Sequence, residues 1–318
     1  MPTDPGLDSE LIDEISKLKN RRGAVIMAHN YQLPEIQAVA DHTGDSLGLA
    51  RLAAATQART IVLCGVSFMA ETAAIICPDK TVLLPEPDAG CPLADMLGTE
   101  DVREARQRFP GLYVISYVNS SAAVKAESDI CCTSSNGVEV LRRAPAERPV
   151  LFCPDRHLGE YAARSLGRDY ALYPREAPVM LWPGFCPTHH RVTVADIRAA
   201  RQAHPRAKVM VHPECDIAVI EAADVAASTG GMLEYPDSVE AAEFIVGTEI
   251  GMLTPLEKRY PDRVFHPLAP QKTVCFNMKR NTLASLRRVL HDEQPVVEVP
   301  AAVAERARGA LERMLAVG

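Results

Sequence analysis

Short apolar segments rich in Val, Ile and Leu alternate along the chain with segments of helical character. The apolar segments predict strands, at residues 24–27, 60–66, 81–84, 112–118, 149–152, 179–181, 208–211 and 243–246. The segments between them predict helices, several of which open with Pro or a capping Ser, Thr or Asp; examples are 34–41, 46–56, 99–108 and 194–203. Strands that are apolar on both faces and alternate with helices are typical of parallel sheets covered on two sides. The pattern therefore predicts an α/β fold.

One arrangement of residues occurs three times. Three predicted strands end in polar triplets, at residues 29–31, 117–119 and 212–214. Twelve residues after the first member of each triplet stands an Asp, and five residues later a hydroxyl residue: Asp41, Asp129 and Asp224, followed by Ser46, Ser134 and Thr229. Such self-similarity indicates repeated structural units. Each unit is predicted to run strand, polar turn, helix, short strand, hydroxyl-bearing turn, helix.

The repeat sets the expected domains. We expect αβα units at residues 1–98, 99–190 and 191–275, with the C-terminal helices of 276–318 packing on the first unit. Loops at the carboxyl ends of parallel strands line the ligand crevice in such folds. If the units pack about a pseudo-threefold axis, the three triplets meet at one central active site.

Composition narrows the classes of function. The chain has 318 residues, of which 47% are hydrophobic, so it can form a substantial core. Its formal net charge of −7, without a compensating basic block, argues against nucleic acid and anionic membrane surfaces as partners. The acidic N-terminus does not resemble a signal peptide, and no apolar run is long enough to span a bilayer. Together with nine cysteines, these features lead us to expect a cytoplasmic protein with reduced thiols.

The cysteines fall into two groups. Six lie in apolar or helical contexts and are interpreted as packing thiols: Cys64, Cys77, Cys131, Cys132, Cys153 and Cys215. The other three, Cys91, Cys186 and Cys275, follow one another at intervals that match the repeat. One thiolate from each unit suits a metal centre with an open coordination position. Spacing alone leaves an iron–sulfur cluster and packing thiols equally weighted, while the lack of Cys-x-x-Cys pairs argues against structural zinc.

Proton transfer and anion binding have candidates in the repeat. His29, Tyr31 and Glu214 stand at strand ends and are our acid/base candidates, with a core histidine and a packed tyrosine as the alternatives for the first two. The hydroxyl turns can hold substrate carboxylates or phosphate beside helix N-termini, although N-capping is the commoner use of Ser and Thr there. Three charged residues are interpreted as surface groups outside the site: Glu71, Lys279 and Arg280.

The ordered motifs resemble those of the quinolinate synthase (NadA) family of de novo NAD biosynthesis, from about residue 11 to 290. They include residues 28–31 (AHNY), 44–46 (GDS), 64–72 (CGVSFMAET), 117–119 (YVN), 133–136 (TSSN), 212–215 (HPEC), 244–249 (FIVGTE) and 275–281 (CFNMKRN). The resemblance implies three αβα domains around a central site. It also implies condensation of iminoaspartate with dihydroxyacetone phosphate to quinolinate, and the enzyme that supplies iminoaspartate as a potential partner.

The resemblance further implies a cofactor and a set of site residues. The cofactor is a [4Fe–4S] cluster with three protein ligands, Cys91, Cys186 and Cys275, and one open iron acting as Lewis acid. The implied substrate contacts are His29, Ser46, Tyr117, Val118, Asn119, Ser134, His212, Pro213, Glu214 and Thr229. Two alternatives remain open: an aconitase-like iron–sulfur hydro-lyase acting on a dicarboxylate, and a non-catalytic zinc protein. A dinucleotide-binding module is disfavoured because no Gly-x-Gly-x-x-Gly follows a predicted strand.

Overall fold

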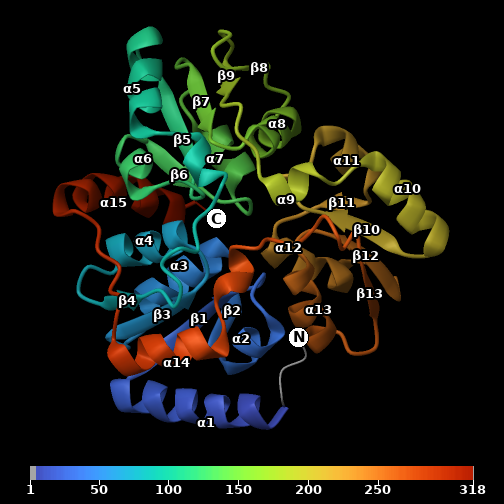
Figure 1. Cartoon of the computed structure of the whole chain (residues 1–318). Helices are drawn as coiled ribbons and strands as arrows, with labels where there is room; N and C mark the ends of the chain where they lie inside the picture. Colours follow the sequence, from blue (N-terminus) through green and yellow to red (C-terminus); the bar gives the residue numbers. More distant parts are fainter. Residues whose placement is uncertain (1–4, 318) are drawn as a thin grey trace. The chain divides into compact units, whose positions relative to one another are not determined.

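The computed structural model describes residues 5–317 (Figure 1). The chain divides into two compact units, the first made of Met1–Cys91 and Cys275–Pro300 and the second of Pro92–Val274 and Ala301–Gly318. The first unit contains one parallel sheet and the second contains two. Helices lie between successive strands in all three sheets, except between the last two strands of the second sheet, Tyr170–Leu172 and Val179–Leu181. The predicted α/β class, with three similar parallel-sheet units, is therefore confirmed.

The first unit has a four-stranded sheet in the order β2-β1-β3-β4. Its strands are β1 (Ala24–His29), β2 (His42–Gly44), β3 (Thr60–Cys64) and β4 (Thr81–Leu83). Its helices are α1 (Pro5–Arg22), α2 (Pro34–Val39), α3 (Ser46–Ala55), α4 (Ser67–Ile76), the 3₁₀ turn η4 (Met278–Arg280) and α14 (Leu283–Asp292). Helices α1 and α14 pack on each other. Their apolar residues, including Ile15 and Leu286, form one core with Ile26 and Val62 of the sheet.

The second sheet, in the second unit, has the order β6-β5-β7-β9-β8. Its strands are β5 (Tyr113–Tyr117), β6 (Ile130–Cys132), β7 (Val150–Cys153), β8 (Tyr170–Leu172) and β9 (Val179–Leu181). The associated helices are η1 (Ala94–Met96), α5 (Thr99–Arg108), α6 (Ala122–Ala126), α7 (Gly137–Arg143), α8 (Arg156–Ser165) and α15 (Ala301–Leu315). The three central strands β5, β7 and β9 are buried along nearly their whole length, which explains their continuous apolar sequences.

The third sheet, also in the second unit, has the order β11-β10-β12-β13. Its strands are β10 (Lys208–Val211), β11 (Val225–Ala226), β12 (Glu243–Gly247) and β13 (Val264–Pro267). Its helices are α9 (Pro187–His190), α10 (Val194–Ala203), α11 (Ile217–Ala222), α12 (Thr229–Glu234), η2 (Tyr235–Ser238), η3 (Ile250–Met252) and α13 (Leu253–Arg259). Ile197 of α10 and Val219 of α11 share a core with Val209 and Ile245 of the sheet.

The three sheets share one strand order. In each, the first strand lies between the second and the third, and the fourth lies beyond the third; β8 adds an extra edge to the second sheet. The chain therefore reverses its winding direction between the first and third strands of each sheet. Ligands of doubly wound α/β folds bind at the carboxyl ends of the strands at this point. In the second and third sheets these positions follow β5 and β7, and β10 and β12.

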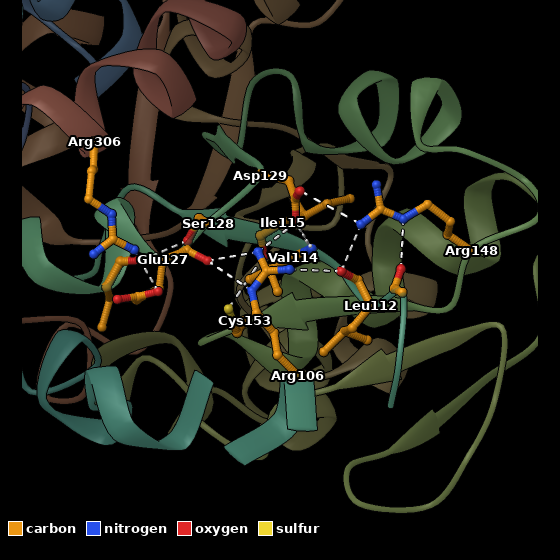
Figure 2. Close-up of polar contacts among 12 residues, drawn as sticks. Arg106, Leu112, Val114, Ile115, Glu127, Ser128, Asp129, Arg148, Cys153 and Arg306 are labelled. Carbon is orange, nitrogen blue, oxygen red and sulfur yellow. Dashed lines mark hydrogen bonds and ion pairs between the residues drawn. The ribbon is translucent and has the colours of Figure 1, made fainter. Parts of the chain in front are cut away.

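The repeated Asp sets the strand register in every sheet. Oδ2 of Asp41 accepts the backbone N–H of Ile26, and Oδ2 of Asp224 accepts that of Val209, both at 2.8 Å. Asp129 makes the same 2.8 Å contact with Val114, as Figure 2 shows. Each Asp also donates its own N–H to the carbonyl of the same strand residue. The residue that follows each Asp pairs, in the neighbouring strand, with the residue that follows the one whose N–H the Asp accepts. These pairs are 42 with 27, 130 with 115, and 225 with 210.

The C-terminal helices pack on different sheets. We expected 276–318 to pack on the first unit, and within that segment α14 packs on α1. Helix α15 packs instead on α6 and β6. The side-chain amide of Asn136 holds it there by donating to the carbonyls of Met314 and Val317 at 3.2 and 2.8 Å. Buried Leu311 and Met314 show that α15 has an apolar face of its own to cover.

Candidate active site

The polar triplets follow the central strand of each sheet. His29 is the last residue of β1, Tyr117 the last of β5, and His212 comes directly after β10. All three side chains are buried. The predicted positions of the triplets, at the carboxyl ends of parallel strands, are therefore those at which doubly wound folds bind ligands.

Two of the triplets hold their histidines in the same way. Nδ1 of His29 accepts the backbone N–H of Tyr31 at 3.1 Å, and Nδ1 of His212 accepts that of Glu214 at 3.3 Å. An imidazole nitrogen that accepts a hydrogen bond carries no proton, so the neutral ring has its proton on Nε2. Both histidines can therefore donate from Nε2. The rings of His29 and Tyr31 also meet edge to face, with centroids 4.6 Å apart.

In the second unit, Glu214 is the centre of a buried polar cluster. Its Oε2 lies 2.8 Å from Nδ1 of His189 and 3.2 Å from Nδ1 of His212. Because Nδ1 of His212 already accepts a backbone N–H, we assign the carboxylate hydrogen bond to His189. The rings of His189 and His212 stack with centroids 4.6 Å apart. Oε1 of Glu214 is buried and has no hydrogen-bond partner within the described part of the chain, which leaves an acceptor for a ligand.

His189 connects Glu214 to Cys186. Its Nδ1 lies 3.2 Å from Sγ of Cys186, and its Nε2 lies 2.8 Å from the hydroxyl of Thr248. Cys186 precedes α9, and Pro187 at the first helical position places His189 one turn further on. Cys186, His189 and Glu214 form a group whose ligand atoms could bind a metal ion. Sequence reasoning missed His189, although its position three residues after Cys186 on a short helix was a usable signal.

The pKa values of two buried carboxyl groups, Glu214 and Asp155, are shifted in opposite directions. Burial alone would raise the pKa of Glu214, but its interactions with the His189 and His212 imidazoles outweigh burial and hold that pKa below its ordinary value. Burial, and next the negative charge of Glu214, raise the pKa of Asp155 well above its ordinary value. Glu214 is therefore the ionised member of the pair and Asp155 the group favoured as a neutral acid.

Asp155 holds the loop that carries Cys186. It follows β7 and is fully buried; its Oδ1 accepts the N–H of Leu158 at 2.9 Å, and its Oδ2 accepts the N–H of Cys186 at 3.1 Å. The loop passes so close to β7 that a Cβ on Gly184 would lie 2.5 Å from the carbonyl oxygen of Pro154. Only glycine fits at that position without displacing backbone. Sequence reasoning did not identify Asp155.

Burial separates the cysteines as predicted. All nine lie in the described residues, and the six interpreted as packing thiols are buried while Cys91, Cys186 and Cys275 are partly exposed. Burial raises the pKa of the Cys64, Cys131 and Cys153 thiols to about 12 and so keeps them protonated. The three partly exposed cysteines follow the fourth strand of each repeat, β4, β9 and β13 respectively.

Two of the three predicted site hydroxyls, those of Ser46 and Thr229, are not the N-caps of the helices they precede or begin. Ser46 and Thr229 are the first residues of α3 and α12, but the residue before each one supplies the cap. Asp45 accepts the N–H of Gly48 at 2.7 Å, and Ser228 accepts that of Gly231 at 3.2 Å. The capping function is thus separated from the predicted site hydroxyls. Ser134 is half-buried and lies three residues before α7.

The remaining predicted site residues lie at the same strand ends. Val118 and Pro213 are buried, and Asn119 is half-buried. Lys279, interpreted from the sequence as a surface group, is half-buried, and its Nζ donates to the carbonyl of Tyr31 at 2.5 Å. The segment after Cys275 is thereby tied to the first triplet.

This fold and these strand-end groups define an α/β protein with three similar parallel-sheet units and a buried carboxylate–histidine cluster beside a cysteine. The model of the family described as "Quinolinate synthetase A protein" (NadA) matches residues 13–316. The chain belongs to this family, a family of enzymes, which confirms the resemblance drawn from its motifs.

Curated relatives extend over almost the whole chain. A quinolinate synthase of Methanoregula boonei is 52% identical over 307 residues, covering 96% of this chain and 98% of the relative. One of Dehalococcoides mccartyi is 50% identical over 310 residues, covering 97% and 99%. One of Desulforudis audaxviator is 47% identical over 311 residues, covering 98% and 99%. Within the described residues, no helix has the length and apolar character needed to cross a membrane.

Proposed function

We propose that this enzyme condenses iminoaspartate with dihydroxyacetone phosphate to form quinolinate, with loss of phosphate and water. Its family and its relatives named quinolinate synthase support the reaction. The observation that carries the cofactor assignment is the distribution of cysteines. The three partly exposed thiols each follow the fourth strand of a repeat, and the other six are buried.

Cys91, Cys186 and Cys275 would hold a [4Fe–4S] cluster. The donor set fits this group, since three accessible thiols can ligate a cluster and leave one iron open, whereas the buried thiols are held protonated. The backbone contact from Asp155 further supports Cys186 by fixing the loop that carries it. When bound, the cluster supplies a Lewis acid that eases departure of a substrate hydroxyl.

The side chains of the triplets perform the acid–base and binding roles in this proposal. Glu214 is held ionised and accepts a proton at Oε1, the oxygen without a hydrogen-bond partner in the described residues. His29 and His212 donate from Nε2 to anionic groups of the substrates, because Nδ1 of each ring is occupied. Tyr31, beside His29, is the further acid/base candidate.

Uncharged hydrogen-bonding groups hold the substrates. Tyr117 and Asn119 offer hydrogen bonds at the end of β5, with Val118 between them, and Pro213 separates His212 from Glu214. The hydroxyls of Ser46, Ser134 and Thr229 bind carboxylate or phosphate oxygens. Support for this role comes from Asp45 and Ser228, which cap α3 and α12 in place of two of these hydroxyls. The nine thiols and the proposed cluster suit a reducing compartment, and we place the enzyme in the cytoplasm.

Anaerobic purification followed by iron, sulfide and quinolinate assays on one sample tests the proposal. We expect broad visible absorbance and quinolinate formation that requires both iminoaspartate and dihydroxyacetone phosphate. Turnover of a dicarboxylate without the triose phosphate would favour the hydro-lyase alternative. A colourless zinc-containing protein without turnover would favour the structural alternative.

A further inference from the structure

A second cluster of metal-ligating side chains lies on the third sheet, away from the candidate active site. It consists of His204, Glu243 and His266, whose ligand atoms all lie within 4.8 Å of one another. Glu243 is the first residue of β12, whereas Thr248, the residue that His189 contacts, follows the last. The two positions are separated by roughly 16 Å along the strand. The cluster is therefore distinct from the strand ends described above.

The fold brings the three side chains together from separate elements. His266 is on β13 and Glu243 on the neighbouring β12, two residues apart in the parallel register and hence on the same face of the sheet. His204 directly follows α10, the helix that packs on this face, and is its C-cap. The rings of His204 and His266 stack with centroids 3.5 Å apart and planes at 14°.

His266 has a buried nitrogen whose hydrogen bonding is unsatisfied. Within the described residues its Nε2 has no hydrogen-bond partner, and Oε2 of Glu243 lies 3.6 Å away, too far for a good hydrogen bond. Buried polar atoms in native proteins are nearly always paired. Two ligand atoms bound to one zinc ion at about 2.0–2.1 Å stand roughly 3.3–3.6 Å apart at angles of about 110–120°. The observed separation matches two ligands of a shared ion.

The donor set and the local charge select the class of ion. Two imidazoles and one carboxylate are ligands typical of zinc and its neighbours, whereas magnesium and calcium prefer oxygen alone. The C-terminal end of α10 and the Glu243 carboxylate both favour a cation. Arg206 opposes it: its Nη2 lies 3.0 Å from Oε1 of Glu243, leaving Oε2 to face His266.

We infer that His204, Glu243 and His266 form a binding site for a borderline divalent cation of the zinc class. The ion ties the C-terminal end of α10 to strands β12 and β13 and leaves a coordination position for water. Binding turns the stacked rings so that one nitrogen of each faces the Glu243 carboxylate. This site is independent of the proposed iron–sulfur centre and of the proposed reaction.

Zinc titration of the anaerobically purified full-length protein tests the inference. Isothermal titration calorimetry with Zn²⁺ is compared between wild type and the variants Glu243→Gln and His266→Ala, with the thermal unfolding midpoint measured with and without Zn²⁺. Glu243→Gln keeps the side-chain length, so it still tests the site if the His266→Ala variant does not fold. His291→Ala is the matched control, because His291 pairs with Asp292 at 2.7 Å and belongs to no three-ligand group among the described residues.

We expect both variants to bind zinc at this site at least tenfold more weakly than wild type and the control. Zinc should raise the unfolding midpoint of wild type more than that of either variant. Arg206→Gln should tighten binding by about two- to fivefold, because an exposed ion pair that competes for Glu243 is removed. Zinc bound elsewhere, for example by thiols, contributes equally to the titrations of all variants, so it does not affect the differences between them. Equal zinc affinity and stoichiometry in wild type, Glu243→Gln and His266→Ala would overturn the inference.

Discussion

Replacing Asp155 by Asn tests whether this buried carboxyl group positions Cys186. The raised pKa of Asp155 favours the neutral acid, so the substitution changes hydrogen bonding more than charge. Asn retains one oxygen, which can still accept the N–H of Leu158, but it replaces the other by an NH₂ group facing the N–H of Cys186. An N–H left unsatisfied in a fully buried position costs about 1–3 kcal/mol. We therefore expect a loss of about 2 kcal/mol in the free energy of unfolding.

Asp45→Asn provides the matched control. Asp45 caps α3 through the N–H of Gly48, as Asp155 caps α8 through that of Leu158. Asn and Asp cap helices about equally well, so the control should lose at most about 0.5 kcal/mol. Urea unfolding compares the stabilities, and iron released to a chelator from the anaerobic proteins measures how firmly Cys186 is held. If Asp155→Asn matches Asp45→Asn in both stability and iron release, the positioning role is refuted.

Three further predictions follow from the same structure. Cys275→Ala should lose the visible absorbance of the anaerobically purified protein, and Cys64→Ala should keep it; full iron in Cys275→Ala would contradict the ligand assignment. Glu214→Gln should keep its iron and bind a dicarboxylate analogue, while quinolinate formation falls by about 10²–10⁴-fold; near-normal turnover would remove Glu214 as the base. Asn119→Asp should instead weaken binding of the analogue, because like charges repel. Asp129→Ala should lower the free energy of unfolding in urea by about 1–3 kcal/mol, because a β5 amide loses its acceptor, and an unchanged value would contradict the register-setting role.

The strands were predictable where burial is complete. All eight predicted strands are present, with bounds within two residues at each end, because strands of a parallel sheet carry apolar residues on both faces. β8 and β13 were missed for opposite reasons. β8 is an exposed edge strand with Leu172 at the surface, and β13 contains His266 and ends in Pro267, so neither has a continuous apolar run.

The candidate site was predictable only where the repeat marks it. Cys91, Cys186 and Cys275 stood out because their intervals follow the repeat, and their exposure agrees with the separation from the other six thiols. His189 has no equivalent in the other two units, so comparison of repeats could not reveal it. Asp155 caps α8, and its second contact, to the N–H of Cys186, depends on a close approach of the two loops that the sequence pattern does not encode.

Comparison of the three repeats distinguishes residues that set the strand register from residues with predicted chemical roles. The Asp that follows each triplet by twelve residues makes the same 2.8 Å backbone contact in every sheet, and it sets the register of the strand that follows it. Its arginine or lysine partners differ between units, so the backbone contact is the common requirement. The strand residue that contacts the Asp lies three residues before the first member of each triplet, so the strand register does not depend on the triplet side chains. These side chains can therefore diverge into imidazole, phenol, amide and carboxylate. An Asp repeated without change thus marks structure, and the residues that vary at equivalent strand ends are the predicted site residues.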